Sequence, residues 1–64
     1  MEKYTLKTAR DRLKLTQETA AKLIGISQDT LSNYERGKSY PDIPTLKKIE
    51  EVYGVTYDQI IFLL

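Results

Sequence analysis

The chain of 64 residues contains no cysteine and no histidine. The absence of cysteine excludes disulfide bonds and thiolate chemistry. The absence of histidine removes the commonest general base and the commonest metal ligand. No other residues stand at metal-ligand spacing. We therefore expect no metal, no cofactor and no enzymatic activity.

Long hydrophobic runs are also missing. The longest is IIFLL at residues 60–64, which is far too short to span a bilayer. The beginning, MEKYTLKTARDRLK, lacks the apolar centre of a signal peptide. A chain this short is expected to form one domain, residues 1–64, with little depth for an enclosed pocket. These absences predict a soluble, cytoplasmic protein.

Charge is nearly balanced overall but unevenly distributed. Residues 1–38 carry eight basic and five acidic side chains, a balance of +3, and residues 39–64 carry two and four, a balance of −2. A modestly basic first part fits a polyanionic partner. Ordinary solvated helix surface also carries such charge, so this feature alone selects no function.

Capping residues and glycines divide the chain into five predicted helices. The first four can be capped by Thr5, Thr16, Ser27 and Asp42. Apolar residues then recur at helical spacing, over about residues 6–14, 17–24, 28–36 and 43–53. A short fifth helix is expected after the capping box TYDQ at 56–59. No segment alternates like a strand, so the expected fold class is all-α.

The second and third helices have the spacing of a helix-turn-helix. Ala21 and Ile24 share one face of the second helix, and Leu31 and Tyr34 point toward the same core from the third. A small side chain at Ala21 lets two helices cross closely, and Gly25 can adopt positive φ in the turn. The pattern indicates a helix-turn-helix, although any αα-hairpin would share it.

The outer face of the third helix favours DNA over a purely structural hairpin. It carries Gln28, Asp29, Ser32 and Asn33. Glutamine and asparagine offer a paired donor and acceptor to adenine, and aspartate accepts from cytosine N4. A face that only needed to be soluble would more often carry lysine and glutamate.

The segment LTQETAAKLIGISQDTLSNYERGK at residues 15–38, with Pro41 and Leu46 after it, resembles the Xre or Cro-like helix-turn-helix family of phage and bacterial repressors. The resemblance covers about residues 6–62, and its most specific parts are LTQ, GIS and YERG. It implies a lambda-repressor-like DNA-binding domain. Ala20 and Leu23 depart from the family pattern, which usually has leucine and a polar residue there.

The resemblance also implies roles for particular residues. Base reading in the major groove falls to Gln28, Asp29, Ser32 and Asn33, with the alternative that Asp29 only complements the helix dipole. Contacts to phosphate fall to Gln17, Thr16, Thr30, Arg36, Lys38 and Tyr40. The alternative for these residues is solvated surface without a partner.

A buried ion pair between Arg10 and Glu35 is a second family feature implied here. If the pair is buried, removal of one partner should cost on the order of 3–5 kcal/mol, because the other charge is left uncompensated. An exposed pair would contribute about 0–1 kcal/mol. We predict the buried case.

Relatives of this kind usually bind palindromic double-stranded DNA as homodimers, with half-sites about 34–36 Å apart. The candidate dimer seam is Ile61, Phe62, Leu63 and Leu64, and the alternative is that these residues close the core. The resemblance thus implies a sequence-specific regulator without a sensor domain, acting as a repressor in a bacterium or a phage-infected host. The rival is a protein-interaction module, such as an antitoxin or a partner-controlled regulator, that uses Leu23, Tyr53, Tyr57 and the C-terminal apolar cluster.

Overall fold

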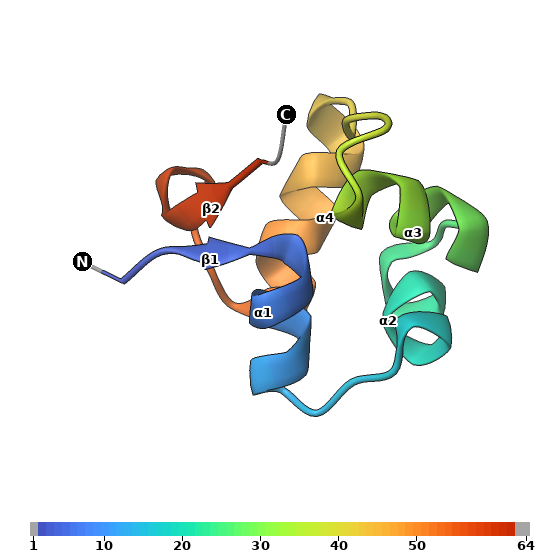
Figure 1. Cartoon of the computed structure of the whole chain (residues 1–64), viewed down its shortest axis with the longest axis horizontal. Coiled ribbons are helices and arrows are strands. Elements are labelled where there is room, and N and C mark those ends of the chain that lie inside the picture. Colours follow the sequence, from blue (N-terminus) through green and yellow to red (C-terminus); the bar gives the residue numbers. More distant parts are fainter. Residues whose placement is uncertain (1, 63–64) are drawn as a thin grey trace.

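The structure is a computed structural model that describes residues 2–62 of the chain. It contains four α-helices: α1 (Leu6–Arg12), α2 (Gln17–Ile24), α3 (Gln28–Glu35) and α4 (Ile43–Tyr53). A 3₁₀ turn, η1 (Tyr57–Gln59), and two short strands, β1 (Tyr4–Thr5) and β2 (Ile60–Ile61), complete it. The strands lie at one end of the molecule, α2 and α3 at the other, with α4 between them (Figure 1). The predicted helical class is confirmed.

Each α-helix is preceded by a capping residue, whose side chain accepts a hydrogen bond from the backbone amide three residues later. The oxygen–nitrogen distances lie between 2.9 and 3.1 Å, and the four capping residues are Thr5, Thr16, Ser27 and Asp42. These bonds satisfy amides that no helical carbonyl can reach. The four predicted helix starts are therefore confirmed.

The helix ends follow from backbone conformation. Gly25 and Gly54 take positive φ, 92° and 68°, and stop α2 and α4. Lys14 also has positive φ, 58°, so α1 ends at Arg12 rather than at the predicted Lys14. A Cβ atom built at Gly25 would have no atom within 4 Å. The requirement for glycine there is therefore one of conformation and not of space.

The prediction of a fifth helix is wrong, as is the prediction that no strand forms. After the single turn η1, the chain runs in parallel beside its own beginning, with Tyr4 opposite Ile60 and Thr5 opposite Ile61. Isoleucine is β-branched and packs well in an extended strand. The pairing also satisfies backbone groups at both ends of the chain. The predicted capping box of Thr56 and Gln59 is confirmed, and the Gln59 side-chain oxygen accepts from the Thr56 amide at 3.0 Å.

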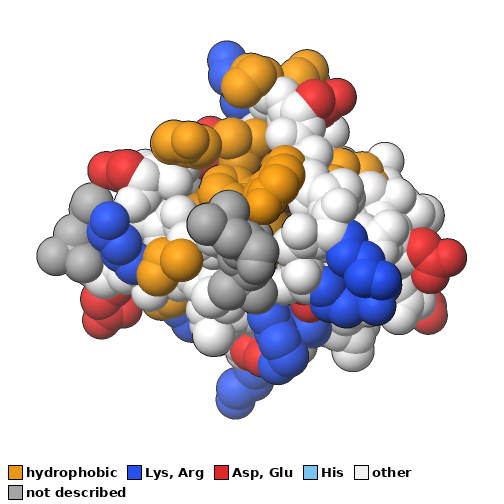
Figure 2. Space-filling view, turned by 45° about the horizontal axis from the view of Figure 1, so that its top comes forward, with side chains coloured by type: hydrophobic (Ala, Val, Ile, Leu, Met, Phe, Trp, Pro, Cys, Tyr) orange, Lys and Arg blue, Asp and Glu red, His pale blue; other side chains and the backbone are white. Residues whose placement is uncertain are grey.

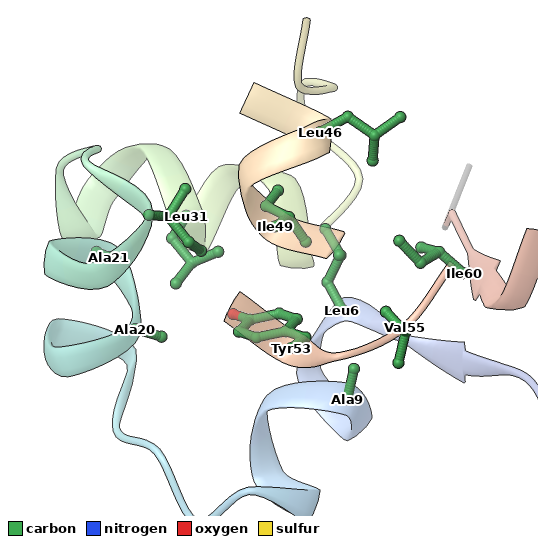
Figure 3. Close-up of a cluster of buried hydrophobic side chains, with 11 residues drawn as sticks. Leu6, Ala9, Ala20, Ala21, Leu31, Leu46, Ile49, Tyr53, Val55 and Ile60 are labelled. Atoms are coloured by element: carbon green, nitrogen blue, oxygen red, sulfur yellow. The ribbon is translucent and has the colours of Figure 1, made fainter. Parts of the chain in front are cut away.

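The core draws on all four helices and on β2 (Figure 3). Its buried hydrophobic residues are Leu6, Ala9, Ala20, Ala21, Ile24, Leu31, Leu46, Ile49, Tyr53, Val55 and Ile60. Ala20 and Ala21 are at most 2% exposed, and Leu31 is fully buried. Small residues on α2 therefore let α3 approach closely, which fixes the angle of the helix-turn-helix.

Tyr53 lies in the centre of this core and is 1% exposed. Its assignment to a partner-binding surface is therefore wrong, because the hydrophobic ring fills the space between the helices. Among the described residues its hydroxyl has no hydrogen-bond partner. Burial raises the pKa of Tyr53 to about 12, since an ionised phenol is poorly solvated there.

Candidate nucleic-acid interface

Helix α3 separates a core face from an accessible face. Leu31 and Glu35 are buried, whereas Gln28 and Asp29 are exposed at its first turn. Ser32 and Asn33, also predicted to read bases, are half-buried farther along the helix. Thr30, predicted to contact phosphate, is half-buried in the first turn. The exposed first turn is thus the part of α3 most open to a ligand.

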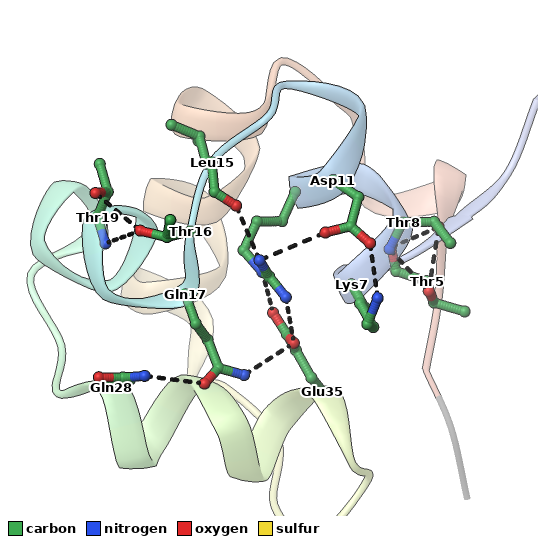
Figure 4. Close-up of polar contacts among 11 residues, drawn as sticks. Thr5, Lys7, Thr8, Asp11, Leu15, Thr16, Gln17, Thr19, Gln28 and Glu35 are labelled. Atoms are coloured by element: carbon green, nitrogen blue, oxygen red, sulfur yellow. Dashed lines mark hydrogen bonds and ion pairs between the residues drawn. The ribbon is translucent and has the colours of Figure 1, made fainter.

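The N-terminus of α2 lies beside that first turn. The Gln28 side-chain nitrogen is 3.4 Å from the Gln17 side-chain oxygen, so the two glutamines predicted to contact DNA lie side by side (Figure 4). The Thr16 hydroxyl oxygen accepts from the Thr19 amide at 3.1 Å. The first two amides of α2 have no helical carbonyl to bond, and they carry the positive end of the helix dipole.

The three residues after α3 that were predicted to contact phosphate differ in their surroundings. Lys38 is exposed. Arg36 is exposed too, but its guanidinium donates to the Asn33 side-chain oxygen at 2.9 Å. The Tyr40 ring packs edge-to-face on Phe62, with centroids 5.9 Å apart. The Arg36–Asn33 contact was not predicted, although a spacing of three residues at a helix end permits it.

The structure brings Arg10 and Glu35 together in a buried ion pair. Arg10 Nε donates to Glu35 Oε2 at 2.7 Å, and Arg10 Nη2 donates to Oε1 at 3.1 Å. The two side chains are 10% and 5% exposed. Hydrogen bonding to Glu35 raises the pKa of Arg10. Arg10 Nη1 donates to the Leu15 carbonyl at 2.8 Å, which ties the α1–α2 loop to the pair.

The ion pair is connected to the accessible face through Gln17. The Gln17 side-chain nitrogen donates to Glu35 Oε1 at 3.1 Å, and Gln17 is itself half-buried between α1 and α3. Hydrogen bonds therefore run from the buried Arg10 guanidinium through Glu35 and Gln17 to Gln28, and Figure 4 shows those from Glu35 through Gln17 to Gln28 as dashed lines. The ion pair and the DNA-contacting glutamines were predicted as two separate features. No local pattern marks the link, because it joins residues from three helices.

A second feature of the surface is hydrophobic. Figure 2 shows hydrophobic side chains gathered on the face that carries the start of α4 and the end of the described chain. The exposed large hydrophobic residues of the last third of the described chain are Tyr40, Ile43, Tyr57 and Ile61, which are 45–65% exposed. The rings of Tyr40 and Tyr57 both lie against Phe62, with centroids 5.9 and 6.4 Å apart, and these three residues are called the apolar patch. Phe62 is half-buried and packs against the core. The other two residues of the predicted dimer seam, Leu63 and Leu64, lie outside the described residues.

Within residues 2–62 no group of three or more carboxylates comes together to hold a metal ion. Over the same residues no helix is long and apolar enough to cross a membrane.

Comparison with known proteins finds a helix-turn-helix family and several HTH-type transcriptional regulators. The profile of a family described as helix-turn-helix matches residues 6–60. The HTH-type transcriptional regulator ImmR of Bacillus subtilis is 41% identical over 56 residues, which are 88% of this chain and 44% of that protein. The HTH-type transcriptional activator BcrR of Enterococcus faecalis is 36% identical over 56 residues, 88% of this chain and 28% of BcrR. This chain thus spans less than half of both relatives.

A shorter relative matches over most of its own length. The uncharacterized HTH-type transcriptional regulator MJ0272 of Methanocaldococcus jannaschii is 38% identical over 58 residues, 91% of this chain and 88% of that protein. No solved structure matches the chain. The family match includes α1 to α4 and the turn at Gly25. The chain therefore belongs to the Xre/Cro-like helix-turn-helix family.

Proposed function

We propose that this chain binds double-stranded DNA sequence-specifically, with α3 in the major groove, and represses transcription by occupying its site. The observation that carries the proposal is the accessible first turn of α3, where Gln28 and Asp29 are exposed beside Gln17 of α2. The family match and the regulator names of the relatives support DNA-binding transcriptional regulation. They also confirm the prediction that the chain is not an enzyme.

Base reading falls to the exposed and half-buried polar residues of α3. Gln28 offers a donor and an acceptor to adenine, and Asp29 accepts from the amino group of cytosine. Asn33 keeps its amide nitrogen for a base acceptor, because its oxygen accepts from Arg36. Ser32 contributes a hydroxyl, which either donates or accepts.

Phosphate contacts position the domain without reading sequence. The N-terminal amides of α2 and the second N–H of the Gln17 side chain suit a phosphate oxygen. Lys38 and Arg36 supply positive charge after α3, and Thr16, Thr30 and Tyr40 supply hydroxyl groups. The exposed Lys38 is the contact of this group that acts mainly through its charge.

Homodimerisation on a palindrome completes the proposal. One domain presents one recognition helix, and a two-fold pair presents two helices to successive major grooves on one side of the duplex. The exposed Ile61 and the adjacent Phe62 supply a hydrophobic contact for such a pair. The apolar patch equally favours a second candidate function, in which a partner protein bound to Tyr57 and Phe62 controls the domain.

The test is selection of binding sites from a random duplex pool with purified protein at moderate salt. We expect an enriched palindromic motif. Gln28→Ala should abolish preference at one base position of each half-site, at a cost of about 1–3 kcal/mol. Lys38→Ala should instead weaken binding to all sequences alike and lower the slope of log affinity against log salt by about one.

Three results would count against the proposal or a part of it. Failure of any sequence to be enriched would refute sequence-specific binding. Capture of a protein partner at low salt together with no DNA binding would favour the partner-controlled candidate. An equal loss of sequence preference in Gln28→Ala and Lys38→Ala would show that the division into base and phosphate contacts is wrong.

A further inference from the structure

Four side chains form a continuous chain of hydrogen bonds from the interior to the accessible end of α3. This amide relay consists of Arg10, Glu35, Gln17 and Gln28, and its successive contacts are 2.7, 3.1 and 3.4 Å. The first two residues are buried, Gln17 is half-buried and Gln28 is exposed. The relay therefore connects a fixed internal charge to a side chain at the protein surface.

The donors and acceptors of the four side chains allow the hydrogen bonds of the relay to run in one direction only. Arginine has donors only and keeps its charge, so Glu35 beside it is a carboxylate, which has acceptors only. Gln17 must turn its nitrogen toward Glu35, and its oxygen then faces Gln28. The Gln28 side chain must in turn offer nitrogen to that oxygen.

This direction decides which hydrogen-bonding groups of the Gln28 side chain remain available to a ligand. One of its two N–H groups is engaged by Gln17, so the side chain retains one N–H donor and its carbonyl acceptor. Adenine presents an acceptor at N7 and a donor at N6 in the major groove, whereas guanine presents two acceptors, N7 and O6. In the opposite direction Gln17 would donate to the Gln28 oxygen, and Gln28 would turn two N–H donors outward, which suit guanine.

We propose that Glu35 is a specificity-determining positioning residue, which sets the direction of the amide relay so that Gln28 selects adenine over guanine. The inference rests on the proposed function, because it assumes that Gln28 meets a base edge. Glu35 acts only through Gln17 and contacts no DNA itself. Its role in readout is separate from its role as the counter-charge of Arg10.

The first test removes the link and leaves the ion pair intact. Gln17→Ala keeps α2, since alanine is a good helix former, and frees the Gln28 amide to turn over. The base position read by Gln28 is identified as the one whose preference disappears in Gln28→Ala. At that position the wild-type preference for adenine over guanine, about tenfold or more, should fall in Gln17→Ala to near one. Lys38→Ala is the matched control, because it should lower affinity and leave the ratio unchanged.

The second test removes the inner acceptor of the relay. In the double variant Arg10→Met/Glu35→Leu no carboxylate remains to accept from the Gln17 side-chain nitrogen, and no buried charge is left unpaired. The Gln17 amide is then free to turn over, and the Gln28 amide with it. The preference for adenine over guanine at the assigned position should fall toward one. Circular dichroism gives the folded fraction, and if this variant does not fold, Gln17→Ala decides alone.

A measurement on the free protein separates failure of this inference from failure of the proposed function. In ¹⁵N-edited NMR spectra the Gln17 side-chain proton directed at Glu35 should lie downfield of the Gln59 amide protons, and it should move upfield in Glu35→Gln. An unchanged adenine-to-guanine ratio in Gln17→Ala would overturn the inference and leave the proposed function standing. If the wild-type chain enriches no site, the proposed function is refuted and base selection by the relay falls with it. An unshifted Gln17 signal would overturn the relay even where DNA binds.

Discussion

Two ion pairs of equal length but different burial allow a direct test of what holds this fold together. Arg10 Nε lies 2.7 Å from Glu35 Oε2, and Lys7 Nζ lies 2.7 Å from Asp11 Oδ2. The side chains of the first pair are 10% and 5% exposed, and those of the second are 63% and 47% exposed. If burial decides the energetics, removing Glu35 and removing Lys7 should have very different effects.

The magnitude for Glu35→Ala follows from what Arg10 would keep. Two of its hydrogen bonds disappear, while the bond to the Leu15 carbonyl at 2.8 Å and the weaker approach of Asp11 at 3.5 Å remain. We therefore expect a loss near the lower end of the usual range for a broken buried pair, about 3 kcal/mol. Lys7→Ala loses only an exposed pair one helical turn apart, so we expect less than about 0.5 kcal/mol.

The assay is thermal and urea unfolding followed by circular dichroism. A domain of this size has a free energy of unfolding of roughly 3–10 kcal/mol, so the expected loss is a large part of it. Because each kcal/mol shifts the Tm of such a small domain by about 4–8 °C, Glu35→Ala should lower Tm by at least about 12 °C. The double variant Arg10→Met/Glu35→Leu should recover the stability, because no buried charge is left unpaired. Similar losses in Glu35→Ala and Lys7→Ala would refute the argument from burial, and so would a double variant as unstable as the single one.

Three further predictions concern the core and the turn. Tyr53→Phe should raise the free energy of unfolding by about 1 kcal/mol in urea titrations, since it removes a buried hydroxyl without a partner; a large loss would reveal a partner. Because the folded pKa of Tyr53 is about 12 against 10.0 unfolded, the unfolded state loses its proton first. Stability should therefore fall between pH 10 and 12, less so in Tyr53→Phe. Gly25→Ala should cost about 1–2 kcal/mol from strained φ alone, and an unchanged Tm would contradict that.

Features that depend on neighbours in the chain could be predicted from the sequence. The caps at Thr16 and Ser27 and the glycine that ends α2 act over one helical turn, so their pattern is visible in a single segment. The core side of α3 was predictable for the same reason, because helical periodicity places Leu31 and Tyr34 toward the core. The burial of Glu35 was expected from the family resemblance and not from periodicity. Most of the helical fold and the accessible polar turn of α3 follow from such local rules.

Features that join distant segments were missed or misjudged. The pairing of β1 with β2 depends on where the chain lies after α4, and no local sequence signal marks this pairing. Tyr53 follows the helical stripe that fills the core, yet an aromatic residue with a polar group also suits a surface. The contact between Gln17 and Glu35 needs three helices in place before it exists. Each of these is decided by tertiary packing, which sequence periodicity does not specify.

The position of Glu35 suggests why a buried ion pair stands where hydrophobic residues would serve stability. Replacing both charges by well-packed apolar side chains is often neutral or stabilising, so the pair with Arg10 is not required for folding alone. An apolar residue at position 35 would leave the Gln17 nitrogen without its acceptor, and the Gln28 amide would no longer have a fixed direction. The double variant Arg10→Met/Glu35→Leu should therefore stay folded and still fail to discriminate adenine from guanine. Stability and readout meet at Glu35, and this double variant should keep the stability while it loses the readout.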